Sequence, residues 1–263
     1  MGEPPPLLQV NRISKHFGGV NVIDDFSMSV AKGEIRALIG PNGAGKTTMF
    51  NMISGILAPA GGNITFEGKD ITVLPPEKIA ALGIGRTFQI SKLFGDMTVI
   101  DNILIGMHTK FTCNFWSNAI PLPGARQDER KKQQLARGYL SIVGLEAKAD
   151  VEARVLPQGD RQLLQIARAV ASEPKLIMLD EPAAGLNSTE AKALISLLRG
   201  IRSSGITIIV VDHDMQFIMD ISDSVTVLNR GQKIAEGTPQ EITSNHDVID
   251  AYLGTNIVKA DKC

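Results

Sequence analysis

The sequence lacks the features that mark a disulfide scaffold or a membrane span. Its 263 residues include two cysteines, Cys113 and Cys263, which match no metal-ligand spacing and are too few for a disulfide framework. We therefore expect a reducing compartment. No apolar run is long enough to cross a bilayer, and the start, MGEPPP, has neither the basic end nor the apolar stretch of a secretion signal. Any contact with a membrane is expected to pass through a protein partner.

An excess of charge of either sign is also missing. Lys and Arg number 27 and Asp and Glu number 28, which leaves a net charge of −1. Nucleic-acid-binding proteins usually carry a basic domain or stripe, so the composition gives no reason to expect a nucleic-acid partner. The hydrophobic share of 43% is ordinary for a globular protein, and this length can bury a large core.

Apolar runs typical of buried strands recur along the chain, with helical patterns between them. These runs are 35–40 (IRALIG), 176–181 (LIMLDE), 206–212 (ITIIVVD) and 224–230 (SVTVLNR). Such runs alternating with helices predict a parallel sheet that helices cover on both faces. Segments 7–30 and 61–71 instead predict short alternating strands in a small antiparallel layer.

Between about residues 89 and 155 the strand signals give way to helical ones, at 97–108 and at 128–145. Segment 110–125, between these two helices, holds the only tryptophan, Trp116, together with Phe111 and Phe115. Two interpretations stay open for these aromatic side chains. They either pack onto the helical part or form an exposed apolar patch that meets a partner.

The strongest motif, GPNGAGKTT, follows a predicted strand and precedes a predicted helix. It comprises Gly40, Pro41, Asn42, Gly43, Ala44, Gly45, Lys46, Thr47 and Thr48, and it fits the pattern G-x-x-x-x-G-K-[ST]. Glycines allow backbone N–H groups to curl around phosphate oxygens, and the helix start adds its positive dipole end. Lys46 is placed to reach the outer phosphates and Thr47 to coordinate Mg²⁺. A plain Gly-rich turn is the alternative, which Lys46 and Thr47 in register disfavour.

Two acids follow the buried run LIML. Because ligands of open α/β sheets bind at the carboxyl ends of the strands, Asp180 is placed to hold Mg²⁺ and Glu181 to orient or deprotonate a water. The alternative is a helix N-cap with a solvated neighbour.

Three further segments, in this order, make the chain resemble the nucleotide-binding subunits of ABC transporters. They are GRTFQ with Gln89, PAAGLN at 182–187, and VVDHDM with His213. The resemblance implies that Gln89 contacts the metal and the water, that 182–187 crosses a dimer interface, and that His213 contacts the γ-phosphate. Phe17 stands where the family has an aromatic that stacks on adenine. Alternatives are a core Phe17, a strand-end His213, and metal ligation by Asp212 to Asp214.

This resemblance spans about residues 7–254 and implies an α/β P-loop NTPase fold, a mostly parallel sheet with a small antiparallel β layer and an inserted helical subdomain. On the basis of this resemblance, we divide the chain into an ATP-binding core at 7–88 and 158–240, a helical subdomain at 89–157 and a short tail at 241–263. Several segments, among them LDEPAAGLN and VIDAYLG, resemble the LivG-type ATPase of branched-chain amino-acid importers. That family implies ATP and Mg²⁺, a second ATPase chain in a heterodimer, two integral membrane permease subunits, and a binding protein that acts indirectly. It also implies that this chain is a peripheral subunit on the cytoplasmic face of the plasma membrane.

The segment LPQGDRQ raises a question, because the family usually has L-S-G-G-Q at this place. The resemblance implies that Leu156, Pro157, Gln158, Gly159 and Asp160 cap the phosphate that is bound by the partner chain. Asp160 then either repels that phosphate, with Arg161 as a neutralising neighbour, or serves as a helix N-cap. The sequence therefore predicts two unequal sites in the heterodimer.

Three other functions stay open. The cargo could be another small polar solute, such as urea or a short amide. The chain could instead be a soluble ABC ATPase that acts on ribosomes or DNA, although it lacks a second cassette and a long coiled-coil insertion. A module that closes on ATP and scarcely hydrolyses it is disfavoured by the intact Lys46, Asp180, Glu181 and His213.

Overall fold

The computed structural model describes residues 5–87, 93–107 and 125–252, in two sheets and a set of helices. The larger sheet has six strands in the order β10-β9-β3-β8-β7-β6, and all neighbours are parallel except β10 and β9. Its strands are β3 (Ile35–Ile39), β6 (Ile84–Arg86), β7 (Leu176–Asp180), β8 (Thr207–Val211), β9 (Ser224–Asn229) and β10 (Gln232–Gly237). The four predicted strand runs are confirmed as β3, β7, β8 and β9.

Burial explains which strands the sequence reveals. Every residue of β3, β7 and β8 is buried, which fits the continuous apolar runs of a sheet covered on both faces. The sequence did not predict β6 and β10. The first has only three residues, and the second contains no fully buried residue, so neither leaves a clear apolar pattern.

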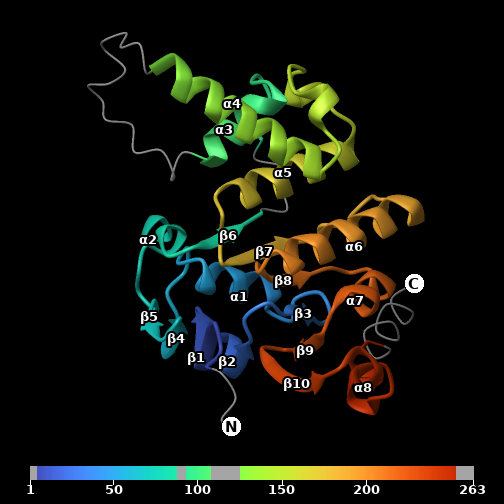
Figure 1. Ribbon diagram of the computed structural model, residues 1–263. Coiled ribbons are helices and arrows are strands. Elements are labelled where there is room, and N and C mark those ends of the chain that lie inside the picture. Colours follow the sequence, from blue (N-terminus) through green and yellow to red (C-terminus); the bar gives the residue numbers. More distant parts are fainter. Residues whose placement is uncertain (1–4, 88–92, 108–124, 253–263) are drawn as a thin grey trace.

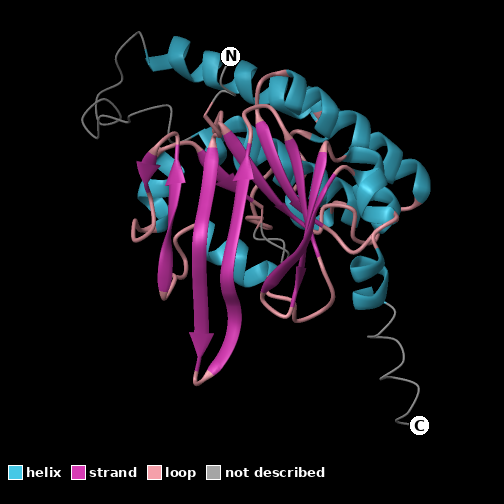
Figure 2. Ribbon diagram, turned by 90° about the horizontal axis from the view of Figure 1, so that it is seen from below, coloured by secondary structure: helices cyan, strands magenta, loops and turns pink. Residues whose placement is uncertain are grey.

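The smaller sheet is antiparallel, in the order β2-β1-β4-β5, as predicted for 7–30 and 61–71. It contains β1 (Leu8–Phe17), β2 (Val20–Val30), β4 (Gly61–Phe66) and β5 (Lys69–Asp70). Figure 2 shows the long β1–β2 hairpin beside the other strands. One hydrophobic cluster lies between the two sheets and includes side chains of helix α1 (Lys46–Ile53) and of α2 (Pro76–Ala81).

A second cluster covers the other face of the larger sheet. It joins the sheet to α5 (Gln158–Ala171), α6 (Ser188–Ser203), α7 (Met215–Ile221) and α8 (Pro239–Thr243). Both faces of this sheet are therefore buried under other elements, as a doubly covered parallel sheet requires.

A third cluster belongs to the helical layer, which lies above α5 in Figure 1. The layer contains α3 (Val99–Gly106), α4 (Ala125–Ile142) and the 3₁₀ turns η2 (Glu146–Lys148) and η3 (Ala153–Val155). Both predicted helices are thus confirmed within a few residues. Helix α5 packs in both of these clusters, since Ile166 belongs to the second and Leu164 to the third.

Two earlier predictions lie outside the described residues: the position of Gln89, and the packing of the aromatic side chains of segment 110–125. In the described part of the chain, no helix combines the length and apolarity that a membrane crossing needs.

Candidate functional site

The carboxyl ends of β3, β7 and β8 open into a cavity of about 340 Å³. Its lining consists of Val22, Asn42, Gly43, Ala44, Gly45, Lys46, Thr47, Thr48, Asp180, Glu181, Val211 and His213. The fold therefore brings together most of the predicted phosphate loop, both acids after β7 and the predicted histidine. These residues come from three separate stretches of sequence, and the parallel order of the sheet is what makes them neighbours.

The phosphate loop is held tightly against the sheets, and two of its glycines have no room for a side chain. A Cβ atom on Gly40 would lie 1.9 Å from the carbonyl oxygen of Leu228, and one on Gly45, whose φ is +111°, would lie 2.5 Å from Cδ1 of Ile23. Gly43 has a φ of +80° and open space around it. The glycines thus set the path of a loop that leads directly into α1.

Lys46 is the first residue of α1 and is buried beneath the loop. Its ammonium group donates hydrogen bonds to the carbonyl oxygens of Gly40 at 2.6 Å and of Pro41 at 3.0 Å. Burial lowers the pKa of Lys46, while the nearby charges of Glu181 and Asp180 oppose this shift. The cation is therefore partly desolvated and lies in the wall of the cavity, where it can meet an anion.

Asp180 is the last residue of β7, and its side chain is only 5% exposed. Burial raises the pKa of Asp180, and the charge of Arg86 acts against this rise. The backbone N–H of Asp180 donates to Oγ1 of Thr87 at 3.3 Å. Since the carboxylate is buried, charged partners are what make it tolerable in the fold.

Glu181 follows Asp180 with a left-handed φ of +51°, a strained conformation for a non-glycine residue. Its backbone N–H donates to the carbonyl of Val211 at 2.7 Å, which fixes the turn against β8. Oε1 of Glu181 lies 2.8 Å from Nε2 of His213. The next long helix, α6, is capped by Asn187, so the alternative that Asp180 or Glu181 caps a helix is wrong.

The Asp-His-Asp sequence divides into one site residue and two structural ones. Asp212 accepts backbone hydrogen bonds from Ala183 at 2.8 Å, His213 at 2.7 Å and Asp214 at 3.0 Å. Asp214 is the N-cap of α7 and accepts from the N–H of Phe217. Among the described residues no group of three His, Cys, Asp or Glu side chains could hold a metal. Both aspartates therefore hold backbone, and His213 faces the cavity.

Phe17 lies at the end of β1 and is not part of the cavity lining. It is 49% exposed, so the alternative that it is a core residue is wrong. The ammonium group of Lys15 lies 5.4 Å from the centre of its ring. An exposed ring next to a cation offers a face on which a planar base can stack.

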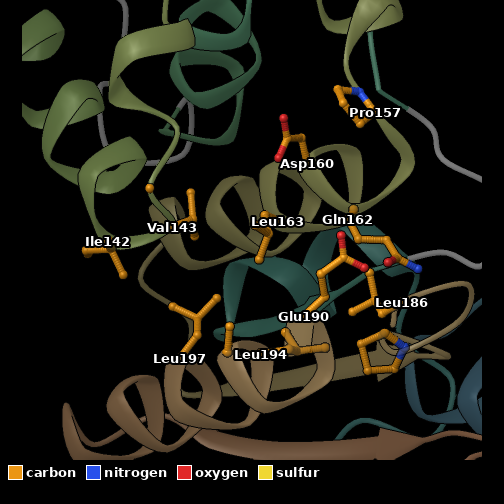
Figure 3. A pocket seen from close by; sticks show the side chains of 14 residues that line it. Ile142, Val143, Pro157, Asp160, Gln162, Leu163, Leu186, Glu190, Leu194 and Leu197 are labelled. Carbon is orange, nitrogen blue, oxygen red and sulfur yellow. The ribbon is translucent and has the colours of Figure 1, made fainter. Parts of the chain in front are cut away.

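The segment from Leu156 to Asp160 contributes no residue to this cavity. Figure 3 shows Pro157 and Asp160 at the start of α5. Pro157, Gly159 and Asp160 line a different and mostly apolar pocket between α4, α5 and α6, whereas Leu156 is buried and Gln158 is exposed. Nε2 of Gln162 donates to the carbonyl of Ala184 at 2.9 Å, which connects α5 to segment 182–187.

The structure corrects two expectations for Asp160. The N-cap of α5 is Pro157, and no side chain caps this helix, so the N-cap interpretation of Asp160 is wrong. Asp160 lies in the first turn instead, where an acid favours the helix dipole. Its ion-pair partner is Lys148 at the end of η2, not the adjacent Arg161.

The residues of the cavity suit both ions that the motif implies, which are Mg²⁺ and phosphate. The carboxylate of Asp180 and the hydroxyl of Thr47 are hard ligands of the kind that Mg²⁺ prefers, and loop N–H groups with Lys46 suit phosphate. Sequence reasoning missed Arg86 and Lys148. For each residue the sequence offered only a charge near a motif. Arg86 lies within GRTFQ, and Lys148 precedes LPQGDRQ.

Comparison with known proteins agrees with this geometry. The ABC transporter family matches residues 23–184, and the branched-chain amino acid ATP-binding cassette transporter family matches residues 232–257. LivG of Salmonella typhimurium, a high-affinity branched-chain amino acid transport ATP-binding protein, is 42% identical, covering 95% of this chain and 98% of LivG. BraF of Pseudomonas aeruginosa, described in the same words, is 40% identical over the same shares.

Two solved structures share the fold. A nucleotide-free ATP-binding cassette of an ABC transporter has a TM-score of 0.82 and 32% identity, covering 94% of this chain and 98% of that one. The ADP conformation of the cassette MJ1267 also has a TM-score of 0.82 and 32% identity, with shares of 95% and 100%. The chain belongs to the ABC transporter family of ATP-binding cassettes and is an ATPase of the group that contains LivG and BraF.

Proposed function

We propose that this chain is the ATP-hydrolysing subunit of an importer that takes up branched-chain or related amino acids. The observation that carries the proposal is the cavity itself, in which Lys46, Asp180, Glu181 and His213 line one space. The similarity to LivG and BraF over nearly the whole chain supports the same activity and the cargo.

The chain's own residues account for ATP binding. Backbone N–H groups of 42–48 surround the phosphate oxygens, and the ammonium of Lys46 leaves the carbonyls of Gly40 and Pro41 for the outer phosphates. Thr47, Asp180 and Gln89 would hold Mg²⁺, which neutralises charge on the phosphates when bound. Phe17 stacks on the base.

Hydrolysis depends on Glu181. Its carboxylate accepts a proton from the attacking water or orients it, and His213 contacts the γ-phosphate. Nε2 of His213 lies 2.8 Å from Oε1 of Glu181, close enough to hold the carboxylate in place before ATP arrives. Rotation of the imidazole toward the phosphate then releases this carboxylate for the water.

The segment from Leu156 to Asp160 serves a second chain. Within one chain it lies in a different pocket from the phosphate loop, which is consistent with a role at a nucleotide that another cassette binds. Separate surfaces of this kind are consistent with two cassettes that complete each other's sites, and the similarity to LivG favours a heterodimer with a second ATPase. ATP closes this dimer at the cytoplasmic face of the membrane, and the helical part moves two integral membrane permease subunits. A binding protein delivers the cargo without touching this chain.

Each part of the chain has its own role in this proposal. We assign ATP binding to 7–88 and 158–240, contact with the permease to the helical subdomain at 89–157, and docking to the tail at 241–263. The separate cluster of the helical layer supports a part that can tilt, and α5, which packs in two clusters, supports its coupling to the sheet.

The test is the substitution Glu181→Gln, which keeps the shape of the side chain and removes its basicity. We expect phosphate release to fall by a factor on the order of 10² or more, because general-base catalysis contributes about that much, while ATP still binds and holds the dimer closed. Glu77→Gln, on the exposed first turn of α2, is the matched control and keeps the wild-type rate. Ordinary turnover by the Glu181→Gln chain would remove Glu181 from the role of base.

A further inference from the structure

Arg86 is a buried cation next to the phosphate cavity that the mechanism above does not use. It is the last residue of β6, and its side chain is only 7% exposed. One of its terminal nitrogens, Nη2, donates to Oδ2 of Asp180 at 3.4 Å. The other, Nη1, donates to Oδ1 of Asn51 at 2.8 Å and to Oγ of Ser54 at 2.9 Å. A buried cation lowers stability unless it is paired and hydrogen-bonded, and these contacts supply partners to both terminal nitrogens of Arg86.

These contacts connect α1 and β7, which both carry residues of the site, to the end of β6. Asn51 and Ser54 lie at the end of α1, the helix that begins at Lys46. Asp180 ends β7, and Arg86 itself ends the strand that leads to residues 88–92. The ring of Phe50, also on α1, has its centre 5.5 Å from Cζ of Arg86 and packs against the guanidinium.

The guanidinium suits this junction because its donors form a rigid planar fork. One edge can face a carboxylate while the other faces two neutral oxygens, an arrangement that the single ammonium of lysine cannot reproduce. The next residue adds a backbone contact, since Oγ1 of Thr87 accepts from the N–H of Asp180. The side chain and the backbone of Asp180 are thus both held by the end of β6.

We propose that Arg86 is a positioning residue that holds the Asp180 carboxylate by Oδ2 and ties it to the end of α1. The carboxylate is thereby aimed into the cavity, and the end of α1, the helix behind the phosphate loop, is linked to the ends of β6 and β7. The inference rests on the proposed function, in which Asp180 holds Mg²⁺ when ATP binds.

The experiment measures how much Mg²⁺ tightens the binding of a fluorescent ATP analogue, as the ratio of the Kd without Mg²⁺ to the Kd with it. We expect Arg86→Met to reduce this ratio about tenfold and Arg86→Lys to reduce it by less, because a charge-assisted hydrogen bond to the carboxylate is lost or weakened. Arg168→Met is the matched control. It removes a guanidinium that packs on the ring of Phe94 and does not line the phosphate cavity, so it should leave the ratio unchanged.

A double-mutant cycle distinguishes positioning from general support of the fold. In an Asp180→Asn chain, Arg86→Lys should change the ratio by less than about twofold, because the partner of the interaction is already gone. The inference is overturned if folded Arg86→Met keeps the wild-type ratio, or if the effects of Arg86→Lys and Asp180→Asn simply add. Where Arg86→Met does not fold by circular dichroism, the lysine cycle decides. If the ATP affinity of the wild-type chain does not depend on Mg²⁺, the proposed function is contradicted instead.

Discussion

Asp160 is the residue whose role differs most between the sequence and the structure. In the sequence LPQGDRQ, Asp160 is an acid at the place where the partner's phosphate is expected. Two unit charges of the same sign about 6 Å apart repel by roughly 3 kcal/mol at an effective dielectric near 20. The structure pairs this acid with Lys148 on η2. The charge is therefore balanced within the chain, by a residue that follows the preceding helix and not by a neighbour in sequence.

Removal of this balance gives a prediction for the pair. Lys148→Met should weaken ATP-driven dimer formation with the partner ATPase about tenfold, because the unpaired carboxylate then faces phosphate. The stability of the chain itself should change by no more than about 1 kcal/mol, since a partly exposed ion pair contributes little. Sedimentation of Glu181→Gln complexes measures the dimer fraction, and adding Asp160→Asn to Lys148→Met should restore it. A Lys148→Met chain whose dimer fraction equals that of the chain with Lys148 intact would contradict the repulsion.

At the scale of elements, the site depends on how the ends of β7 and β8 are joined. Asp212 follows β8 and accepts the buried N–H of Ala183, which follows β7, together with two N–H groups of its own turn. This carboxylate holds the turn that presents Glu181 from one side and His213 from the other. Its function is structural, although its sequence context resembles a metal motif.

Asp212→Ala should therefore lower the free energy of unfolding by about 2–3 kcal/mol, because buried backbone N–H groups lose their acceptor. Urea denaturation measures the change. Asp214→Ala, which removes only the cap of α7, should cost about 1 kcal/mol and serves as the control. A loss below about 0.5 kcal/mol for Asp212→Ala would show that the joint between the two strands does not depend on this carboxylate.

The elements also show what could be predicted from the sequence. The phosphate loop, Asp180 and Glu181 were predictable because each stands beside a fully buried strand with a strong apolar pattern. Strand β6 has three residues and no such pattern, so Arg86 at its end was missed. The contact between Lys148 and Asp160 was also missed, because it depends on how η2 packs beside the start of α5, and local sequence does not encode that packing.

At the scale of the whole molecule, the two surfaces to which the proposed function assigns ATP lie in one chain but apart from each other. The phosphate cavity opens at the ends of the sheet strands, whereas the segment from Leu156 to Asp160 lies at the start of α5, beneath the helical layer. Under the proposed function, a second cassette therefore completes the catalytic site of this chain. Helix α5 packs in the core of the helical layer and in the core of the sheet, so it is the element through which the proposed closure would reach the helical layer.

The central claim is that ATP hydrolysis at Glu181 drives amino-acid uptake, and uptake by cells measures it most directly. In cells whose own copy is deleted, the wild-type chain should restore uptake of labelled leucine and Glu181→Gln should not, although both accumulate to equal levels. Labelled urea and a short amide, tested in the same cells, show whether the cargo is another small solute. If deletion of the chain leaves leucine uptake unchanged, the proposed cargo is contradicted. If cells with Glu181→Gln take up leucine at the full rate, the proposed mechanism is contradicted.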